Sequence, residues 1–442
     1  MKNILIVTYV FPPYIAVGGY RILKFCKFLP QYGFKPSILT LENPNTRAHD
    51  PESLKLVADD INIYRTGTFE PFRIKEQPKA VSKANQQDVA QSPPAASEPS
   101  IIDKLKRQIK LNMTVPDASR FWTNFGVKKG LEAIKNEKID IILSSSPPQS
   151  VHMLGTKLAK LSSLPNILDF RDLWTQNTSY HEKKLPDYLA KRDRKYEKDC
   201  LENATGIIVN TDTFKQQLLD KNNFLTETMI QTVTNGVDSD DFIKYLKPYP
   251  PNEKFTMLYS GSLYGKHRNP DFFLEAVNKW IAEDASVKNN LCIKFIGNKT
   301  PEYIQMVTKY GLEGVVEGID WMSQDELFEK MMATDLLLVF QGFDPVLNAA
   351  IPRKLFEYMV TGKDIMAFAP EGEIPDLINR YNCGKSFASK ETKPIIDFLR
   401  EKYQHWMTRK ESRQSEVKLR DMGDLETKKQ VEILADFAES LL

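Results

Sequence analysis

The sequence predicts an α/β protein with two consecutive domains, each built around a parallel β-sheet. Short apolar runs alternate with helix-like segments, which is typical of strands joined by crossover helices. The alternation stops at a proline-rich stretch and then starts again. The chain also has 442 residues, more than one hydrophobic core normally serves.

In the first half, apolar runs predict buried strands at Ile4–Val10, Ser37–Leu41, Ile139–Ser144, Asn166–Phe170 and Gly206–Asn210. Helix-like segments, such as Arg21–Pro30 and Phe125–Lys135, lie between most of these runs. A strand–helix–strand series of this kind predicts a parallel sheet with helices on both faces.

The break is Tyr245–Glu253, which holds three prolines and no apolar run. Beyond it we predict strands at Phe255–Tyr259, Leu291–Ile296, Gly314–Glu317, Leu336–Phe340 and Ile365–Phe368, with helices such as Asp271–Glu283 and Gln324–Ala333. We therefore expect a first domain over 1–244, a second over 254–405 and a helical C-terminal segment over 406–442. The sequence does not show on which domain that segment packs.

Two segments of the first domain depart from this rhythm. Residues 76–100 are rich in Lys, Gln, Ala, Ser and Pro and nearly lack large apolar residues, so we expect a flexible surface insertion. The next segment, Ile101–Met113, has the pattern of an amphipathic basic helix. It either packs on its own domain or contacts anionic lipid head groups through Lys104, Lys106, Arg107 and Lys110.

Composition excludes several function classes. The net charge is +2, from 60 basic and 58 acidic residues, which argues against a general binder of nucleic acid. Four scattered cysteines without metal-ligand spacing indicate a reduced compartment. Ile4–Val10 is too short for a secretory leader, and no apolar run approaches the roughly 18 residues that span a bilayer. We expect a soluble cytoplasmic protein, with peripheral contact at the inner membrane face as an option.

Three segments at predicted strand ends of the first half can carry chemistry. Gly18–Gly19 can free backbone amides to hold phosphate, or can simply form a turn. Ser144–Ser146 and the nearby His152 lie where open α/β sheets bind ligands, although the serines can also cap a helix and His152 can belong to the core. Asp169–Trp174 concentrates three charges; Asp172 can accept a proton from an acceptor hydroxyl, or the segment is a salt-bridged strand end.

Two segments of the second half suit a nucleotide. In Ser260–Arg268, Gly261 and Gly265 precede three potential cations, Lys266, His267 and Arg268. These side chains can neutralise a diphosphate, or the segment can be a solvated basic loop. Pro352–Met359 predicts a helix with proline in its first turn and Glu357 just over one turn inside. Glu357 can accept hydrogen bonds from a ribose diol, or can simply complement the helix dipole.

Taken together, these segments resemble glycosyltransferase family 4 and its relatives with the GT-B fold, in which two Rossmann-like domains face a central cleft. The resemblance spans nearly the whole chain in order. The strand, FPP and glycine turn that end in Arg21 resemble the family's N-terminal loop. SSSPP with His152, followed by DFRDLW, resembles a subgroup that acts in cell-surface polysaccharide assembly. TNGVD, LYSGSL and IPRKLFEYM resemble the segment before the hinge, the start of the second domain and the donor-site helix.

The resemblance implies a role for each candidate residue. Donor binding would fall to Gly18, Gly19, Lys266, Arg268, Lys354 and Glu357, with Arg268 the first choice for the phosphates and Glu357 for the ribose. Asp172 and His152 would be catalytic, and Arg21 and Arg171 would lie on the acceptor side. The implied activity is retaining transfer from a UDP- or GDP-sugar to a saccharide or lipid-linked acceptor in a bacterium, with no cofactor and no metal.

Two departures from the family pattern leave alternatives open. Ala349 stands where many members have a first glutamate, and Ser262 stands where many have arginine. The alternatives are a non-transferring GT-B enzyme, such as a nucleotide-sugar epimerase, and a non-catalytic nucleotide-sugar binder. A metal-dependent GT-A transferase is disfavoured, because Asp238–Asp240, which forms a DxD pattern, is expected in the hinge.

Overall fold

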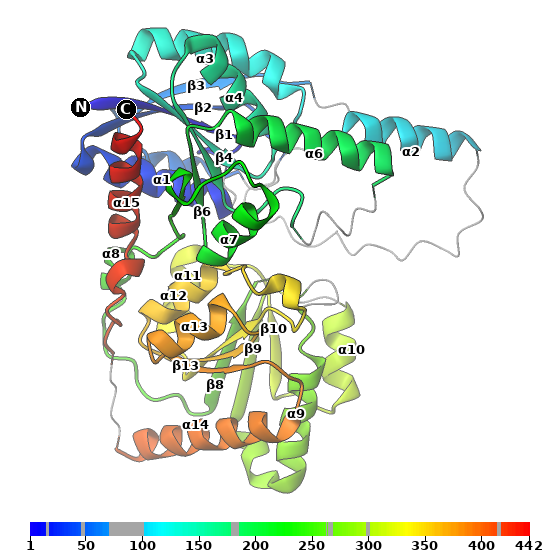
Figure 1. The fold of residues 1–442 in the computed structure, drawn as a ribbon. Helices are drawn as coiled ribbons and strands as arrows, with labels where there is room; N and C mark the ends of the chain where they lie inside the picture. The colour runs from blue at the N-terminus through cyan, green and yellow to red at the C-terminus, as the bar shows by residue number, and fades with distance from the viewer. Residues whose placement is uncertain are drawn as a thin grey trace. The chain divides into compact units, whose positions relative to one another are not determined.

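The computed structural model describes residues 1–14, 17–45, 49–69, 101–177, 185–261, 263, 268–297, 301–412 and 417–442. These residues form two compact units. The first contains the chain up to Asn235 together with Thr427–Leu442, and the second contains Gly236–Glu426. Each unit has a parallel sheet covered by helices, which confirms the predicted α/β class (Figure 1). The predicted insertion 76–100 lies outside the described residues.

The first unit is built on a seven-stranded parallel sheet of order β3-β2-β1-β4-β5-β6-β7. Its strands are β1 (Lys2–Thr8), β2 (Phe34–Leu41), β3 (Asn62–Thr66), β4 (Ile141–Ser146), β5 (Asn166–Phe170), β6 (Gly206–Val209) and β7 (Ile230–Thr232). β1, β4 and β5 lie in the middle of the sheet. Their side chains are buried over most of each strand, which is why they appear in the sequence as continuous apolar runs.

Helices cover both faces of this sheet: α1 (Val17–Phe28), α3 (Trp122–Glu137), α4 (Ser150–Ser162), α6 (Asp187–Glu202) and α7 (Asp212–Lys221). One core contains residues of α1 with Ile4, Ile6 and Ile38, and a second contains residues of α3 and α4 with Leu5 and Val7. The alternate residues of β1 therefore serve opposite faces, as the pleat requires.

The C-terminal helix α15 (Thr427–Ser440) belongs to the first unit. Its residues Val431, Leu434 and Phe437 join the core of α1, and Figure 1 shows it beside that helix. A side chain at Gly206 would meet Phe437 and Leu441 at under 3 Å, so β6 begins with glycine where α15 approaches.

The second unit has a six-stranded parallel sheet of order β10-β9-β8-β11-β12-β13. Its strands are β8 (Phe255–Ser260), β9 (Leu291–Ile296), β10 (Val316–Ile319), β11 (Leu336–Phe340), β12 (Asp364–Phe368) and β13 (Gly384–Phe387). Its helices are α8 (Asp240–Ile243), α9 (Asp271–Glu283), α10 (Pro301–Lys309), α11 (Gln324–Met332), α12 (Arg353–Val360), α13 (Glu373–Arg380) and α14 (Thr392–Ser412). One face packs against α9 and α14, and the other packs against α11, α12 and α13.

The unit boundaries differ from the sequence-based division. The first unit ends at Asn235 rather than 244, because the segment after it is tied to the second unit. Phe242 and Tyr245 pack on Phe328, and Val237 N donates to Leu425 O at 3.0 Å. The expected C-terminal segment 406–442 is also divided, since α14 runs through residue 405 and only Thr427–Leu442 returns to the first unit.

The helix α2 (Ile101–Met113) has the predicted bounds. Its end is held by α6, because Arg192 Nη2 donates to Asn112 O at 2.7 Å. Ile109, which the sequence placed on the apolar face, is 50% exposed. Helix α2 therefore packs on its own unit at one end and leaves part of its predicted apolar face uncovered.

Candidate functional site

The sheet orders define where ligands should bind. In open parallel sheets, the crevice lies outside the carboxyl ends of two neighbouring strands whose connections run in opposite directions. That switch point falls between β1 and β4 in the first unit, and between β8 and β11 in the second. The segments that follow β1, β4 and β8 are the ones in which the sequence placed Gly18, His152 and Arg268.

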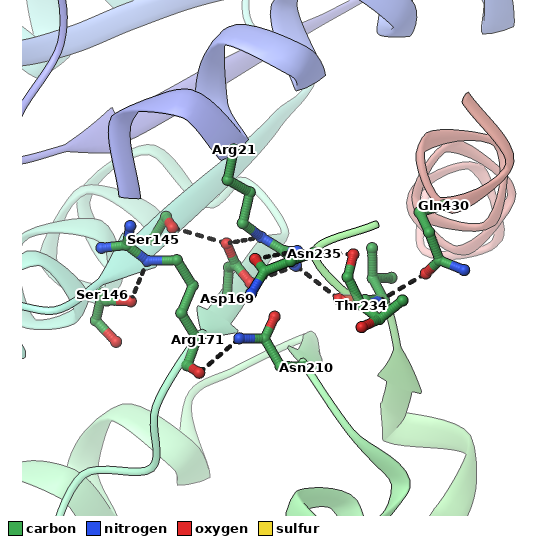
Figure 2. Close-up of polar contacts among 10 residues, drawn as sticks. Arg21, Ser145, Ser146, Asp169, Arg171, Asn210, Thr234, Asn235 and Gln430 are labelled. Atoms are coloured by element: carbon green, nitrogen blue, oxygen red, sulfur yellow. Dashed lines mark hydrogen bonds and ion pairs between the residues drawn. The ribbon is translucent and has the colours of Figure 1, made fainter. Parts of the chain in front are cut away.

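A buried network holds the first of these ends together (Figure 2). Arg21 on α1 forms a bidentate ion pair with Asp169 at the end of β5, with Nε–Oδ2 and Nη2–Oδ1 distances of 3.1 and 3.0 Å. Ser145 at the end of β4 donates to the same carboxylate at 2.7 Å. Both ionic side chains are almost fully buried, 3% and 0% exposed. The network thus ties α1, β4 and β5 at the ligand-binding edge of the sheet.

Arg21 also holds the segment that leaves this unit. Its Nη2 donates to Val233 O at 2.8 Å, and its Nη1 donates to Thr234 O and Asn235 Oδ1 at 3.0 and 3.4 Å. These contacts and the ion pair account for all five N–H groups of the guanidinium. No N–H group of Arg21 remains for a ligand, and its expected place on the acceptor side stays a prediction. Arg21 instead ties α1 to Asp169 within the protein. The sequence did not reveal this partner.

Arg171 makes different contacts from those expected. The sequence paired it with its flanking carboxylates, but Nε and Nη2 donate to Ser146 O and Pro147 O, at 2.6 and 2.8 Å. Its Nη1 lies so close to Gly18 that a Cβ on that glycine would be 1.1 Å away. The remaining guanidinium nitrogen therefore rests on the first turn of α1.

We predict that Gly18→Ala displaces Arg171 and that Gly19→Ala does not. The alanine methyl at position 18 cannot coexist with the guanidinium, which would lose its two carbonyl bonds at a cost of about 1–2 kcal/mol. A Cβ at Gly19 would meet nothing closer than Val10 O at 3.7 Å. Thermal unfolding should show a lower Tm for Gly18→Ala alone; equal Tm values for the two variants would contradict this packing.

His152 is a buried histidine held by the serine cluster. Its Nδ1 lies 2.9 Å from Ser144 Oγ, its ring lies 4.3 Å from that of Phe170, and its Nε2 has no partner among the described groups. Burial first, and then Arg171, lower the pKa of His152 to about 3. The ring is therefore neutral at pH 7. Because the pKa of His152 is lower in the folded state than in the unfolded state, the free energy of unfolding decreases as pH falls from about 6.5 toward 3.

The serines do not cap a helix. Ser144, Ser145 and Ser146 are the last residues of β4 and are buried, whereas α4 begins later, after Gln149, which makes no side-chain cap. The helix-capping alternative is therefore wrong. Two of the three hydroxyls instead orient His152 and Asp169.

Asp172 is the carboxylate of this edge that the protein leaves unused. It is partly buried, and no hydrogen bond to it is present among the described residues. Desolvation raises the pKa of Asp172, while the nearby Arg171 opposes that rise. A carboxylate in such surroundings is more basic than one in water, and can take up or share a proton from a ligand.

The second unit holds its loop end in a different way. Tyr358 on α12 accepts from Ser260 N at 2.8 Å and lies 2.9 Å from Ser260 Oγ. Lys354 Nζ donates to Ser260 O at 2.7 Å and lies 3.7 Å from the centre of the Tyr259 ring. Gly261 follows with φ of +112°. Helix α12 thus fixes the carboxyl end of β8, and glycine lets the chain turn there.

Two of the predicted donor residues, Arg268 and Glu357, influence a third, Lys354, at this end. Burial, and then the charge of Arg268, lower the pKa of Lys354 well below its ordinary value, while Glu357 raises it. Arg268 and Glu357 therefore each lie within electrostatic range of Lys354. Glu357 forms an ion pair with Arg353 at 3.0 Å, a contact the sequence did not predict. Lys266 and Ser262 lie outside the described residues.

The sequence reading missed an exposed tryptophan at the same edge. Trp321 follows β10 and is 48% exposed. Its ring lies over Gly297 at the end of β9, where a Cβ would approach the indole to 2.9 Å. A tryptophan soon after the predicted strand at Gly314–Glu317 is the sequence signal that could have identified it. Aromatic faces of this kind are suited to stacking on a nucleobase.

Comparison with solved structures identifies the fold. The chain matches Anabaena HepE in complex with UDP-glucose at 12% identity and a TM-score of 0.57, covering 100% of this chain and 99% of that one. The chain has the GT-B fold. WaaG, a glycosyltransferase involved in lipopolysaccharide biosynthesis, matches at 13% identity and a TM-score of 0.55 over 98% of both chains.

A third match carries a different assignment. A protein assigned as a UDP-N-acetylglucosamine 2-epimerase from Listeria monocytogenes matches at 10% identity and a TM-score of 0.52, covering 97% of this chain and 94% of that one. No protein-family model and no curated protein matches the sequence. At 10–13% identity these matches establish the fold of the chain and not its reaction.

Two further findings concern the described residues only. None of their helices is both long and apolar enough to cross a membrane. They also contain no group of three or more His, Cys, Asp or Glu side chains that could hold a metal ion. The expected metal-free reaction remains a prediction.

Proposed function

We propose that this chain transfers a glycosyl group from a nucleoside-diphosphate sugar to an acceptor hydroxyl. The observation that carries the proposal is the position of Lys354 against Ser260 at the carboxyl end of β8, beside the Gly261 turn and within electrostatic range of Arg268 and Glu357. Two cations suit a diphosphate, and a carboxylate one helical turn away suits a ribose diol. The low pKa of Lys354 reflects repulsion and burial that a bound diphosphate would offset.

Uridine diphosphate sugars are the proposed donors. HepE, which shares the fold, binds UDP and UDP-glucose. In this chain, Trp321 over Gly297 offers a flat surface near the carboxyl ends of β9 and β10, where a base would lie if the diphosphate sits at Arg268. The proposed acceptor is a saccharide or a lipid-linked saccharide of cell-surface polysaccharide synthesis, transferred with retention and without a metal. The basic helix α2 provides the proposed peripheral membrane contact.

Trp321→Ala should weaken binding of both UDP and uridine roughly tenfold, because one base–indole stack is worth about 1–3 kcal/mol. Trp321→Phe retains an aromatic face and should recover most of the affinity. Calorimetric titration of the three proteins gives the comparison. Unchanged uridine affinity in Trp321→Ala would place the base elsewhere.

The diphosphate and ribose contacts can be tested with the same titrations. Arg268→Ala should weaken UDP binding at least about tenfold and uridine binding little, since a charge-assisted contact contributes roughly 1.5–3 kcal/mol. Glu357→Ala should weaken both ligands, and should weaken 2′-deoxy-UDP less than UDP.

Arg400→Ala and Glu283→Ala are matched controls, because they remove an arginine and a glutamate that are exposed on the second unit and paired with each other. Both controls should bind UDP as the wild type does. If Arg268→Ala and Glu357→Ala also bound UDP normally, the second unit would not hold the donor at this place.

The epimerase alternative is supported by the Listeria match and by the loss of two family residues, at Ala349 and Ser262. Ala349 is 1% exposed, so the missing glutamate is replaced by a small buried side chain. An epimerase returns an altered nucleotide sugar and requires no acceptor. A transferase releases the nucleotide when an acceptor is present, so product analysis separates the two.

A further inference from the structure

The second unit contains a large charged cavity at the opposite edge of its sheet. The cavity has a volume of about 970 Å³ and is lined by residues that precede or begin β11 and β12, by α14, and by 418–426. Its basic lining residues are Lys363, Lys402, His405, Arg409, Lys418 and Arg420. It lies at the amino ends of strands whose carboxyl ends are roughly 15 Å away, so it is separate from the proposed donor site.

Every acidic side chain of this lining has a partner in the protein. Asp335 accepts from Arg409 Nη2 at 3.0 Å and from Asn252 Nδ2 and Thr256 N, each at 2.9 Å. The other three carboxylates are also occupied: Asp364 by Lys402, Asp421 by Gly423 N, and Glu426 by Ser239. Asp335 and Asp364 are thus paired with the cations Arg409 and Lys402, whereas Asp421 and Glu426 accept from neutral groups.

Several cationic groups of the lining are left without such partners. The Lys363 ammonium is half-buried and makes no hydrogen bond or ion pair among the described residues. Burial, and then Arg409, lower the pKa of Lys363, with Asp335 opposing that shift. Lys418 and His405 are exposed on the rim.

Capping of helix α12 explains part of the position of Arg420 and does not explain the position of Lys363. Arg420 Nη1 donates to Met359 O at 2.7 Å and to Lys363 O at 3.5 Å, which caps the carboxyl end of α12. Those two bonds use one amino group of the guanidinium and leave Nε and Nη2 without a partner in the described part of the chain. They also do not explain why Lys363 is held beside Arg409. A ligand anion would pair with both the Lys363 ammonium and the Arg420 guanidinium.

We propose that this cavity binds a phosphate group, held by Lys363 and Arg420, on a ligand larger than inorganic phosphate. The volume is of the size that small-molecule ligands occupy. The phosphate can belong to a soluble phosphorylated compound or to a lipid head group. The proposal does not depend on the proposed donor site.

The first experiment uses the wild-type protein and inorganic pyrophosphate. Lysines are acetylated with and without pyrophosphate, and the modified residues are quantified by mass spectrometry. Lys363 should be protected at least about fivefold, whereas the exposed Lys288, which is remote from the cavity lining, should be unchanged. Equal modification of Lys363 with and without both pyrophosphate and anionic vesicles would overturn the proposal.

The second experiment measures affinity in an Arg268→Ala background, which removes the proposed donor contact. Adding Lys363→Gln and Arg420→Gln should weaken pyrophosphate binding at least about tenfold, as expected for two charge-assisted contacts. Lys288→Gln with Arg400→Gln removes two exposed cations of the same kinds and should have no effect. Lys363→Gln alone serves if the double variant unfolds, because Lys363 makes no side-chain bond to the fold.

Vesicles separate the two sources of phosphate. Phosphatidylglycerol vesicles that bind the Arg268→Ala protein and not its Lys363→Gln variant, while pyrophosphate fails to bind, indicate a lipid head group. The reverse result indicates a soluble ligand. Pyrophosphate and vesicle binding that are both unaffected by Lys363→Gln would overturn the proposal, whatever the Arg268 result shows about the donor site.

Discussion

Asp172→Asn is expected to lower turnover by about a hundredfold or more while leaving donor affinity nearly unchanged. Asparagine keeps the shape of the side chain and removes both its charge and its ability to accept a proton. Asp172 is the acid of its sheet edge that has no hydrogen bond among the described residues, whereas Asp169 is saturated by Arg21 and Ser145. Steady-state rates at saturating donor, together with calorimetric donor affinities, give the two quantities.

The stability of the variant distinguishes a catalytic loss from misfolding. Because burial raises the pKa of Asp172, its ionised form costs the folded state free energy at neutral pH. Asp172→Asn removes that cost and should have a Tm equal to or above that of the wild type. Asp60→Asn, at an exposed acid, is the matched control and should retain full turnover. Full turnover in Asp172→Asn would make the residue part of a strand-end charge cluster and nothing more.

Arg21→Met is expected to destabilise the first unit by about 3–5 kcal/mol, because it leaves the carboxylate of Asp169 buried without its partner. The same change removes the bonds to Val233 O, Thr234 O and Asn235. Hydrogen exchange should therefore accelerate in α1, in β5 and in the segment 233–235. Peptides of the second unit should exchange as in the wild type.

Two further variants test the physical cause. Arg21→Lys retains the charge but has three donors instead of five, so its loss should be intermediate. Arg21→Met combined with Asp169→Leu removes the unpaired charge and should recover part of the stability. If the double variant were as unstable as the sum of its single variants, burial of the lone carboxylate would not be the cause.

The strands of the fold could be predicted where they are buried on both faces. β8, β9, β11 and β12 are buried over nearly their whole length, and their predicted positions were confirmed to within one residue. The edge strands β3, β7 and β13 were missed, because β3 and β13 are partly exposed and polar and β7 has only three residues. Strand β10 begins at Val316 rather than Gly314, since Gly314 adopts a φ of +79° in the turn before it.

The candidate site could be predicted as a set of segments but not as a set of contacts. The resemblance to the GT-B family predicted that Arg268, Lys354 and Glu357 serve one ligand, and Lys354 lies within electrostatic range of the other two. The partners of Arg21 and Arg171 could not be predicted, since each lies on a different element and they include backbone carbonyls, which no sequence pattern marks. The same holds for α15, whose apolar face is visible in the sequence while the surface it covers is not.

Nucleotide release from UDP-sugars, measured with and without an acceptor extract, tests the central claim most directly. The proposed transferase should release UDP several-fold faster when the extract is present, with the sugar recovered on an acceptor, and Asp172→Asn should abolish the increase. Conversion of the UDP-sugar to an isomer at the same rate with and without extract would contradict transfer and favour an epimerase. Tight UDP binding with no turnover of any tested UDP- or GDP-sugar would contradict catalysis and favour a nucleotide-sugar binder.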